Sequence, residues 1–375
     1  VGVYLYINSL KLVNYRNYDE LLVEFNKKVN LIIGMNGQGK TNLVEAIGFM
    51  SIGRSFRTNK DRELIKFSAE NLYCGCDFTR NNIDKKIEIV VAKDKKGVKV
   101  NGVSIKSMQE LLGNLNVVIF SPEDLRLVKD GPKERRSFID KEVSQIMPRY
   151  YSLLTNYNKI LHQRNTVLKS YRIDENLLDV YDETMSTYAS EIYIIRNRFI
   201  EKLSEISRKI HKNLTMDKEN LTIIYKNQVD LESGQDASQV RLNLLEKLKE
   251  SRQGDMITRA TKVGPHKDDM KIFINDIDVR MYGSQGQQRT ASISLKLSEI
   301  ELIKQEVGDY PVLILDDVFS ELDQTRQKML VEKLENIQMF VTSADPLHKD
   351  ILDIEDYSIF SIENGRLIGV ENGGV

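Results

Sequence analysis

The sequence predicts an α/β protein whose mixed sheet contains antiparallel strands, with a helical lobe inserted into the middle of the chain. Three observations predict this architecture. Alternating apolar and polar residues, typical of half-buried strands, fill the first third of the 375-residue chain. The apolar period becomes helical between about residues 134 and 213. Two short apolar runs near the end, at 312–315 and 339–341, are typical of buried parallel strands.

The first third is rich in strands around one helix. An apolar run at 29–33 leads into a glycine-rich loop and an apolar helix at 43–50. Further strands are expected at 4–13, 21–25, 72–78, 86–92 and 98–105. Within the last of these, Asn101-Gly102 is a strong signal for a two-residue hairpin turn.

The middle of the chain carries two apolar stripes at helical spacing, over 150–161 and 181–210. The tyrosines and the methionine in them fit the buried seam of a helical pair better than a cofactor site. Strand periodicity returns at 221–225 and 270–279. The chain is therefore expected to leave its sheet, form a helical lobe and return to complete the sheet.

Composition is that of a globular protein in a reducing compartment. No apolar stretch approaches the roughly 20 residues that a membrane-spanning helix needs, and the first residues alternate like a strand instead of forming a secretion signal. Cys74 and Cys76 share one face of an expected strand, and no second pair completes a zinc site. The formal net charge is −1, so a nucleic-acid surface would have to be a local basic patch. We expect a cytoplasmic protein with no membrane segment.

A phosphate-binding loop follows the apolar run at 29–33. Residues 34–41 fit the pattern G-x-x-x-x-G-K-[ST], with a strand before it and an apolar helix after it. Backbone N–H groups of such a loop surround a phosphate, Lys40 reaches the β- and γ-phosphates, and Thr41 ligates Mg²⁺. The expected nucleotide-binding residues are Gly34, Met35, Asn36, Gly37, Gln38, Gly39, Lys40, Thr41 and Asn42. The sequence therefore predicts a site for ATP and Mg²⁺.

Two acidic residues end the apolar run at 312–315. Asp316 and Asp317 stand where a Walker B site needs its carboxylates, beside the phosphate-binding loop at the carboxyl edge of a parallel sheet. We expect Asp316 to hold Mg²⁺, directly or through water, and Asp317 to act as the base that polarises the attacking water. Taken alone, the two acids would equally fit an exposed strand end, and the loop beside them favours the catalytic interpretation.

Two further motifs indicate a P-loop ATPase of the ATP-binding-cassette (ABC) type. Residues 282–289 open a long helix with the serine, glycine and glutamine of an ABC signature, and residues 320–323 look like a D-loop. In ABC proteins the signature caps the γ-phosphate bound by the opposite subunit. The residues expected to act in trans are Ser284, Gly286, Gln287 and Asp323. A homodimer with two ATP molecules in its interface follows from this interpretation.

These motifs also set the expected domains. An ABC-type ATPase head would be formed by residues 1–130 plus 260–375, because the first part carries the phosphate-binding loop and the second carries the signature and the acidic pair. Residues 131–259 would form the inserted helical lobe.

Over essentially its whole length the chain resembles the RecF family. Dense, ordered motifs carry the resemblance, among them Gly53-Arg54-Ser55-Phe56-Arg57 and Gly264-Pro265-His266-Lys267-Asp268-Asp269. The others lie at 12–18, 36–42, 120–125, 131–136, 283–289 and 315–323. The family consists of cytoplasmic bacterial ATPases, so the resemblance implies weak, DNA-stimulated ATP hydrolysis with Lys40, Ser284, Asp316 and Asp317 as the catalytic set.

The resemblance also implies partners. RecF-like proteins dimerise with ATP and bind double-stranded DNA near gaps. They work with RecO and RecR to load RecA on single strands covered by SSB, and they support the SOS response. A DNA replication, recombination and repair role is therefore expected, with no membrane partner.

The chain departs from the general ABC pattern at three positions. Asp317 replaces the usual glutamate and is one methylene shorter, so slow hydrolysis is expected. No switch histidine follows the strand at 339–341, where Thr342 or Ser343 could instead donate a hydrogen bond to phosphate. Residues 121–123, Ser-Pro-Glu, occupy the position of the Q-loop glutamine, whose role stays open.

A locally basic segment supplies candidate DNA contacts. The candidates within it are Arg126, Lys133, Arg135 and Arg136. Such side chains would bind phosphates without reading sequence, and a solvated charged face explains the same pattern.

Arg54 and Arg57 fit either a phosphate or DNA contact or an exposed surface, whereas His266 fits a structural or interface role better than a metal site.

Three other functions are weighed against this one. A transporter ATPase would share the motifs but would need a switch histidine and a subdomain that docks on a membrane protein. An SMC-type chromosome tether would need coiled coils of hundreds of residues. An ATP-dependent protein-interaction module without DNA contact fits the neutral charge balance and stays open.

Overall fold

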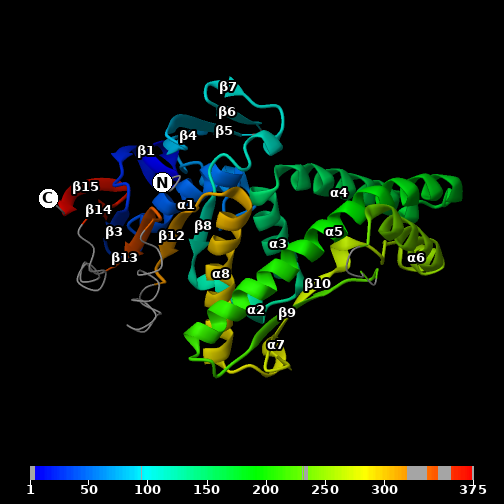
Figure 1. Cartoon of the computed structure of the whole chain (residues 1–375). Coiled ribbons are helices and arrows are strands. Elements are labelled where there is room, and N and C mark those ends of the chain that lie inside the picture. The colour runs from blue at the N-terminus through cyan, green and yellow to red at the C-terminus, as the bar shows by residue number, and fades with distance from the viewer. Residues whose placement is uncertain are drawn as a thin grey trace. The chain divides into compact units, whose positions relative to one another are not determined.

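The chain divides into two compact units in the computed structural model. Unit 1 comprises Val1–Asp124 and Glu299–Val375, and unit 2 comprises Leu125–Ser298. The structure describes residues 5–93, 95–229, 231, 235–318, 336–344 and 356–373. In Figure 1, unit 1 takes the blue-to-cyan and the orange-to-red ends of the colour range, and unit 2 takes the green and yellow middle. Both ends of the chain therefore contribute to one unit.

One sheet of unit 1 is antiparallel, with the strand order β2-β1-β4-β5-β6-β7. Its strands are β1 Leu5–Tyr15, β2 Tyr18–Glu24, β4 Asn71–Arg80, β5 Ile83–Ala92, β6 Lys95–Val100 and β7 Val103–Ser104. Asn101 and Gly102, with φ of 51° and 79°, make the predicted hairpin turn between β6 and β7. Cys74 and Cys76 are buried as free thiols on β4, and burial raises the pKa of each.

The other sheet of unit 1 is mostly parallel, with the strand order β15-β14-β3-β13-β12-β8. Its strands are β3 Val29–Ile33, β8 Val117–Phe120, β12 Val312–Asp316, β13 Met339–Ser343, β14 Tyr357–Glu363 and the antiparallel edge strand β15 Arg366–Gly373. β12 and β13 are buried along their whole length, which confirms the two predicted parallel strands. Because β8, β12, β13 and β3 run in the same direction, their carboxyl ends meet at one edge.

Helix α1, Lys40–Ile52, contacts both sheets of unit 1. It is apolar on nearly every side and buries Leu43, Ile47 and Phe49, among others. These side chains join one apolar core with residues of the antiparallel sheet, such as Leu12, and of the parallel sheet, such as Phe340. A helix that is apolar all round needs such enclosure, so the core fixes the position of its first turn.

Unit 2 is mainly helical. Its helices are α2 Arg126–Lys129, α3 Pro132–Ile146, α4 Pro148–Lys169, α5 Glu175–Leu214, α6 Ala237–Thr258, α7 Val279–Tyr282 and the first part of α8 Gln285–Val307. The predicted second stripe lies on α5, a helix of 40 residues. Helix α6 was missed, because its buried positions are few and one of them is charged. None of the described helices is both long enough and apolar enough to span a membrane.

A three-stranded antiparallel sheet completes unit 2. It has the order β11-β10-β9, formed by β9 Leu221–Lys226, β10 Asp269–Ile274 and β11 Ile277–Asp278. The domain boundary expected near residue 260 falls between β9 and β10 of this sheet, whereas the structural unit continues to Ser298. The reason is that β10 takes β9 as its neighbour, and periodicity along the chain carries no information on strand partners.

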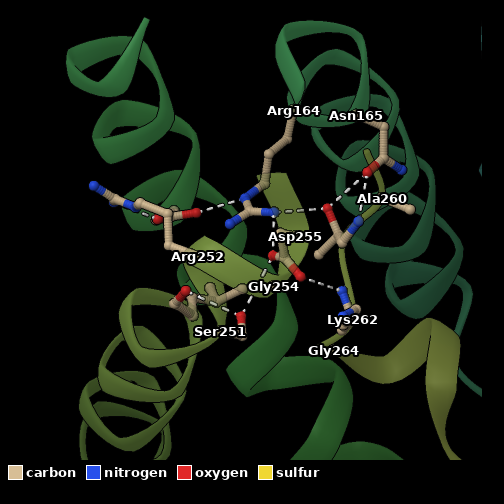
Figure 2. Close-up of polar contacts among 12 residues, drawn as sticks. Arg164, Asn165, Ser251, Arg252, Gly254, Asp255, Ala260, Lys262 and Gly264 are labelled. Atoms are coloured by element: carbon tan, nitrogen blue, oxygen red, sulfur yellow. Dashed lines mark hydrogen bonds and ion pairs between the residues drawn. The ribbon is translucent and has the colours of Figure 1, made fainter. Parts of the chain in front are cut away.

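A buried ion-pair network joins the long helices of unit 2 (Figure 2). Arg164 on α4 donates to Asp182 on α5 at 2.6 Å and to Asp255 on α6 at 2.8 Å. All three side chains are fully buried. Arg252 on α6 donates to Asp182 as well, at 2.7 Å, and the Thr261 hydroxyl accepts from Arg164 at 2.8 Å. Buried charges need such partners, because removing one leaves the others desolvated and unpaired.

Candidate functional site

The predicted phosphate-binding loop lies between the carboxyl end of β3 and the first turn of α1. Gly34, Gly37 and Gly39 have φ of 155°, 81° and 117°, a region that favours glycine. A Cβ on Gly34 would lie 2.3 Å from the carbonyl oxygen of Ile362, so only glycine fits there. Lys40 is 4% exposed, and its Nζ donates to the Gly34 carbonyl at 2.7 Å. The loop therefore turns back around the lysine ammonium group.

Two β-turns brace this loop. Asn17, in the turn between β1 and β2, donates to the Gln38 carbonyl at 3.0 Å and accepts from Asn42 at 2.8 Å. In the turn between β14 and β15, the backbone N–H of Asn364 donates to the Gln38 side chain at 2.6 Å. Met35 is exposed at the tip of the loop. The bracing residues were missed as functional residues, because only the fold brings these turns to the loop.

The acidic pair lies at the carboxyl end of β12, beside the loop. Asp316 is 5% exposed, and its Oδ1 accepts from the Thr41 hydroxyl at 3.0 Å and from the Thr342 hydroxyl at 2.8 Å. Asp317 has φ of 54°, and its backbone N–H donates to Thr342 Oγ1 at 3.0 Å. The structure thus brings together Lys40, Thr41 and Asp316, as expected. Oxygen donors of this kind are those that Mg²⁺ prefers.

Opposing effects act on the pKa of Asp316, which is raised overall. Burial raises the pKa of Asp316, and the hydrogen bonds from Thr342 and Thr41 oppose that rise by stabilising the carboxylate. The negative charge of Asp317 raises the pKa further, and the positive charge of Arg57 lowers it. A cation at this edge of the sheet would therefore relieve an unfavourable concentration of negative charge.

Thr342 contacts the acidic pair. Its hydroxyl carries one proton, and that proton is donated to Asp316. That proton would have to leave Asp316 to reach a phosphate, so the expected donation from Thr342 stays a prediction. The position expected for the Q-loop also reaches this edge, because Ser121 follows Phe120, which pairs with Leu315 in the register of β8 and β12.

A cluster of charges surrounds the second turn of α1. Glu45 is fully buried and accepts from Arg16 Nε and Nη2 at 2.9 and 2.6 Å. Arg57 donates to Asn42 at 2.8 Å and to Glu45 at 3.3 Å, and the Ser55 hydroxyl donates to Glu45 too. Arg57 thus lies close to the phosphate-binding loop. The sequence alone fits either a phosphate or DNA contact or an exposed position for this residue.

The signature residues form the N-terminus of α8. Ser284 Oγ accepts from the Gln287 backbone N–H at 3.2 Å, while the Gln287 side chain accepts from the Ser284 N–H at 2.9 Å. This reciprocal pair is a capping box. Ser284 and Gly286 are exposed, and the Gln287 side chain also donates to Glu219 at 2.9 Å. An exposed helix N-terminus that carries a serine hydroxyl suits the binding of an anion.

The D-loop prediction falls on residues 320–323, which include Asp323 and lie outside the described residues.

Most of residues 264–269 are buried in unit 2, and Lys267 is exposed. The Tyr157 hydroxyl lies 2.6 Å from His266 Nδ1, and His266 Nε2 lies 3.1 Å from the carbonyl oxygen of Thr261. Burial lowers the pKa of His266 to about 4. Burial also raises the pKa of Asp268 to about 6, although Arg196 opposes this rise. Both ring nitrogens of His266 are therefore engaged within the protein, in line with a structural role.

The four candidate DNA contacts differ in their exposure. Arg135 is 2% exposed and donates to both carboxylate oxygens of Asp269 at 2.6 and 3.1 Å. This buried ion pair removes Arg135 from the candidates. The sequence pattern included it because a run of basic residues does not show which arginines are buried. Arg136 is half-buried and donates to the Asp268 carbonyl at 2.6 Å. Lys133 and Arg126 are exposed, and Arg126 pairs with its neighbour Asp130 at 2.9 Å.

Known proteins resemble this chain over its whole length. The family model described as "RecF/RecN/SMC N terminal domain" matches residues 6–359. The "DNA replication and repair protein RecF" of Clostridioides difficile (strain 630) is 60% identical over 98% of this chain and 99% of its own. A protein of the same name from Alkaliphilus oremlandii (strain OhILAs) is 44% identical over 96% of this chain and 99% of its own.

Solved structures agree. The structure described as "the recombination mediator protein RecF-ATP in RecFOR pathway" has a TM-score of 0.92 and 40% identity, and the match covers 99% of this chain and 98% of that one. An SMC head domain from Pyrococcus furiosus, 16% identical with a TM-score of 0.55, covers 99% of this chain and 96% of its own and shares the fold alone. The fold is therefore that of an ABC/SMC-type ATPase head with antiparallel and parallel sheets and an inserted helical unit, and the chain belongs to the RecF family.

Proposed function

We propose that this chain is an ATP-dependent DNA-binding protein of replication, recombination and repair. It would bind double-stranded DNA near gaps as an ATP-bridged homodimer in the bacterial cytoplasm. With RecO and RecR it would promote the loading of RecA on SSB-coated single strands and support the SOS response. The observation that carries the ATP part is the meeting of Lys40, Thr41 and Asp316 at one sheet edge. Membership in the RecF family supports the DNA part.

The residues of unit 1 divide the work on ATP between them. Lys40 and the loop N–H groups bind the phosphates, and Thr41 and Asp316 hold Mg²⁺, which screens the phosphate charge. Asp317 is the base that orients and polarises the attacking water. The side chain of Asp317 is shorter than that of a glutamate and leaves the carboxylate farther from that water, so hydrolysis is slow. Hydrolysis then resets the dimer.

The signature supplies the second half of each ATP site. Ser284 offers its hydroxyl at the exposed start of α8, Gly286 leaves room for the phosphate, and Gln287 orients the serine through the reciprocal hydrogen bonds. A subunit provides these groups to the ATP of its partner, with Asp323 as a further contribution in trans. ATP then stabilises the dimer to the extent that it binds the dimer more tightly than the monomer.

DNA binding rests on phosphate contacts. Lys133 and Arg126 are exposed and Arg136 is half-buried, so these three remain the candidates. The alternative of an ATP-dependent module that binds only protein stays open, because the formal net charge of −1 is nearly neutral. A DNA titration with and without ATP distinguishes the two functions.

The decisive experiment measures molar mass by light scattering with Mg²⁺-ATP, together with binding to a gapped duplex. Three samples are compared: the parent, Lys40→Met and Ser284→Arg. The parent should double its mass and bind DNA more tightly with ATP, and neither variant should do so. A parent that stays monomeric would contradict the signature interpretation, and equal DNA binding without ATP would contradict the ATP-gated clamp.

A further inference from the structure

Thr342 connects the two acidic residues at the nucleotide edge. It lies on β13 opposite Asp316 in the parallel register of β12 and β13, and it is 1% exposed. Its hydroxyl donates to Asp316 at 2.8 Å and accepts from the Asp317 backbone N–H at 3.0 Å. One hydroxyl group thus contacts the side chain of one acid and the backbone of the next.

The directions of these hydrogen bonds are fixed by chemistry. A backbone N–H can only donate, so the Thr342 oxygen is the acceptor from Asp317. The single hydroxyl proton then points to the Asp316 carboxylate. Hydrogen bonds linked in such a chain polarise and strengthen one another, most of all when a charged acceptor ends the chain.

The backbone of Asp317 needs support from its surroundings. Its φ of 54° lies in the left-handed region, which costs a residue other than glycine on the order of 1–2 kcal/mol. Such conformations persist when neighbouring groups hold them, and they are frequent at functional sites. The hydrogen bond to Thr342 is one such restraint on the backbone from which the Asp317 carboxylate projects.

The second hydroxyl on Asp316 belongs to Thr41, at 3.0 Å from the same oxygen. In the proposed function Thr41 ligates Mg²⁺, so its hydroxyl proton and oxygen have to reorient when the metal binds. Thr342 lies on β13, between β3 and β12, and no role as a metal ligand is assigned to it, so its hydrogen bonds need not change when the metal binds. It is then the hydroxyl that orients Asp316 while the nucleotide is bound.

We propose that Thr342 is a positioning residue that fixes both acids of the nucleotide site, the carboxylate of Asp316 for Mg²⁺ and the backbone of Asp317 for the attacking water. This inference rests on the proposed ATPase function. It assigns to the hydroxyl of Thr342 a role that neither the loop nor the signature supplies, and it predicts damage to metal binding and turnover with little damage to ATP binding itself.

The test compares Thr342→Val, which keeps the shape and removes the hydroxyl, with Thr342→Ser, which keeps the hydroxyl. Thr79→Val is a matched control, because Thr79 is buried in the same unit and its hydroxyl also joins a carboxylate, Asp84 at 2.7 Å, to an N–H donor, Asn8 at 2.9 Å. Three quantities are measured for each variant. They are the affinity for a fluorescent non-hydrolysable ATP analogue without metal, the Mg²⁺ concentration at half-maximal thermal stabilisation with that analogue, and kcat and KM for ATP.

For Thr342→Val we expect analogue affinity without metal within about twofold of the parent, a Mg²⁺ midpoint raised about fivefold or more and kcat lowered about tenfold or more, as for one lost hydrogen bond to a charged group. Thr342→Ser should recover most of both losses, and Thr79→Val should match the parent. If Thr342→Val does not fold, Thr342→Cys is compared with Thr342→Ser, because a thiol is a weak donor of nearly the same size.

Several results would overturn the inference. A Mg²⁺ midpoint and kcat equal to those of the parent in Thr342→Val would do so, as would a serine variant damaged as much as the valine variant, which would indicate packing of the methyl group. Equal losses in Thr79→Val would indicate a general cost of the substitution. A parent that neither binds nor hydrolyses ATP would instead refute the proposed function, which is a distinguishable result.

Discussion

The two units bury charge in different ways. Among the described residues, the largest fully buried side chains include three arginines, Arg135, Arg164 and Arg196, and all three belong to unit 2. In unit 1 the corresponding side chains are tyrosines and phenylalanines, and its buried Lys40 and Asp316 lie at the nucleotide edge. Unit 1 also buries the carboxylate of Glu45, beside a partly exposed Arg16. Among the described residues, fully buried arginines paired with carboxylates are therefore the feature that distinguishes unit 2. Buried ion pairs contribute little net stability but make the loss of one partner costly.

The largest expected effect comes from breaking the network around Arg164. Arg164→Met leaves Asp182 and Asp255 short of a partner in the interior and should lower the free energy of unfolding of unit 2 by roughly 3–5 kcal/mol. The measurement is hydrogen exchange of peptides from α4 and α6. Peptides of the parallel sheet in unit 1 serve as the internal control. Unchanged exchange in α4 and α6 would contradict a network that holds these helices.

Lys40→Met tests unit 1 and should weaken ATP binding without changing hydrogen exchange in unit 2. Loss of the ammonium group should lower the affinity for ATP about 10- to 100-fold, the effect of one or two charge-assisted hydrogen bonds. Exchange in α4 and α6 should match the parent. The measurement is calorimetric titration with ATP. Parent-like affinity would remove Lys40 from the phosphate site.

His266 should make the stability of unit 2 depend on pH. Its folded pKa of about 4 lies below the ordinary value of 6.5, so the neutral form is favoured and its contribution is lost as pH falls from 6.5 towards 4. Asp268 acts in the opposite direction. Its folded pKa of about 6 lies above its ordinary value, so protonation of Asp268 below pH 6 stabilises the folded state.

Replacing the histidine isolates its contribution. His266→Gln should gain about 2 kcal/mol relative to the parent between pH 7 and pH 5, which is measured by urea unfolding at both pH values. Asp268 remains in both proteins, so its effect cancels in the comparison. A constant difference between variant and parent across this range would contradict the buried neutral imidazole.

The smallest effect is expected at the surface of the same unit. Glu205 and Lys209 form an exposed ion pair at 2.7 Å, one turn apart on α5. Glu205→Gln should leave the melting temperature unchanged within error, because exposed pairs are screened by water and salt. A large decrease would mean that surface charge, and not buried charge, stabilises the helices of unit 2.

The sequence predicted what is local and missed what depends on the fold. The glycine-rich loop, the apolar strands β12 and β13 and the long stripe of α5 each carry their signal in a few consecutive residues, and the structure has them all. The bracing role of Asn17 and Asn364 and the bridge made by Thr342 depend on contacts between distant segments. Arg135 was misread for the same reason, since its partner Asp269 lies 134 residues away.

The two buried thiols of β4 give the protein a built-in reporter of opening. Cys74 and Cys76 are fully buried, so an alkylating reagent can reach them only when the antiparallel sheet separates. The rate of pulsed alkylation therefore measures the free energy of that opening without any substitution. The chain also contains no tryptophan, so a single tryptophan introduced into unit 2 would report on that unit by fluorescence. Nucleotide and DNA could then be scored for which unit each one stabilises, in one sample.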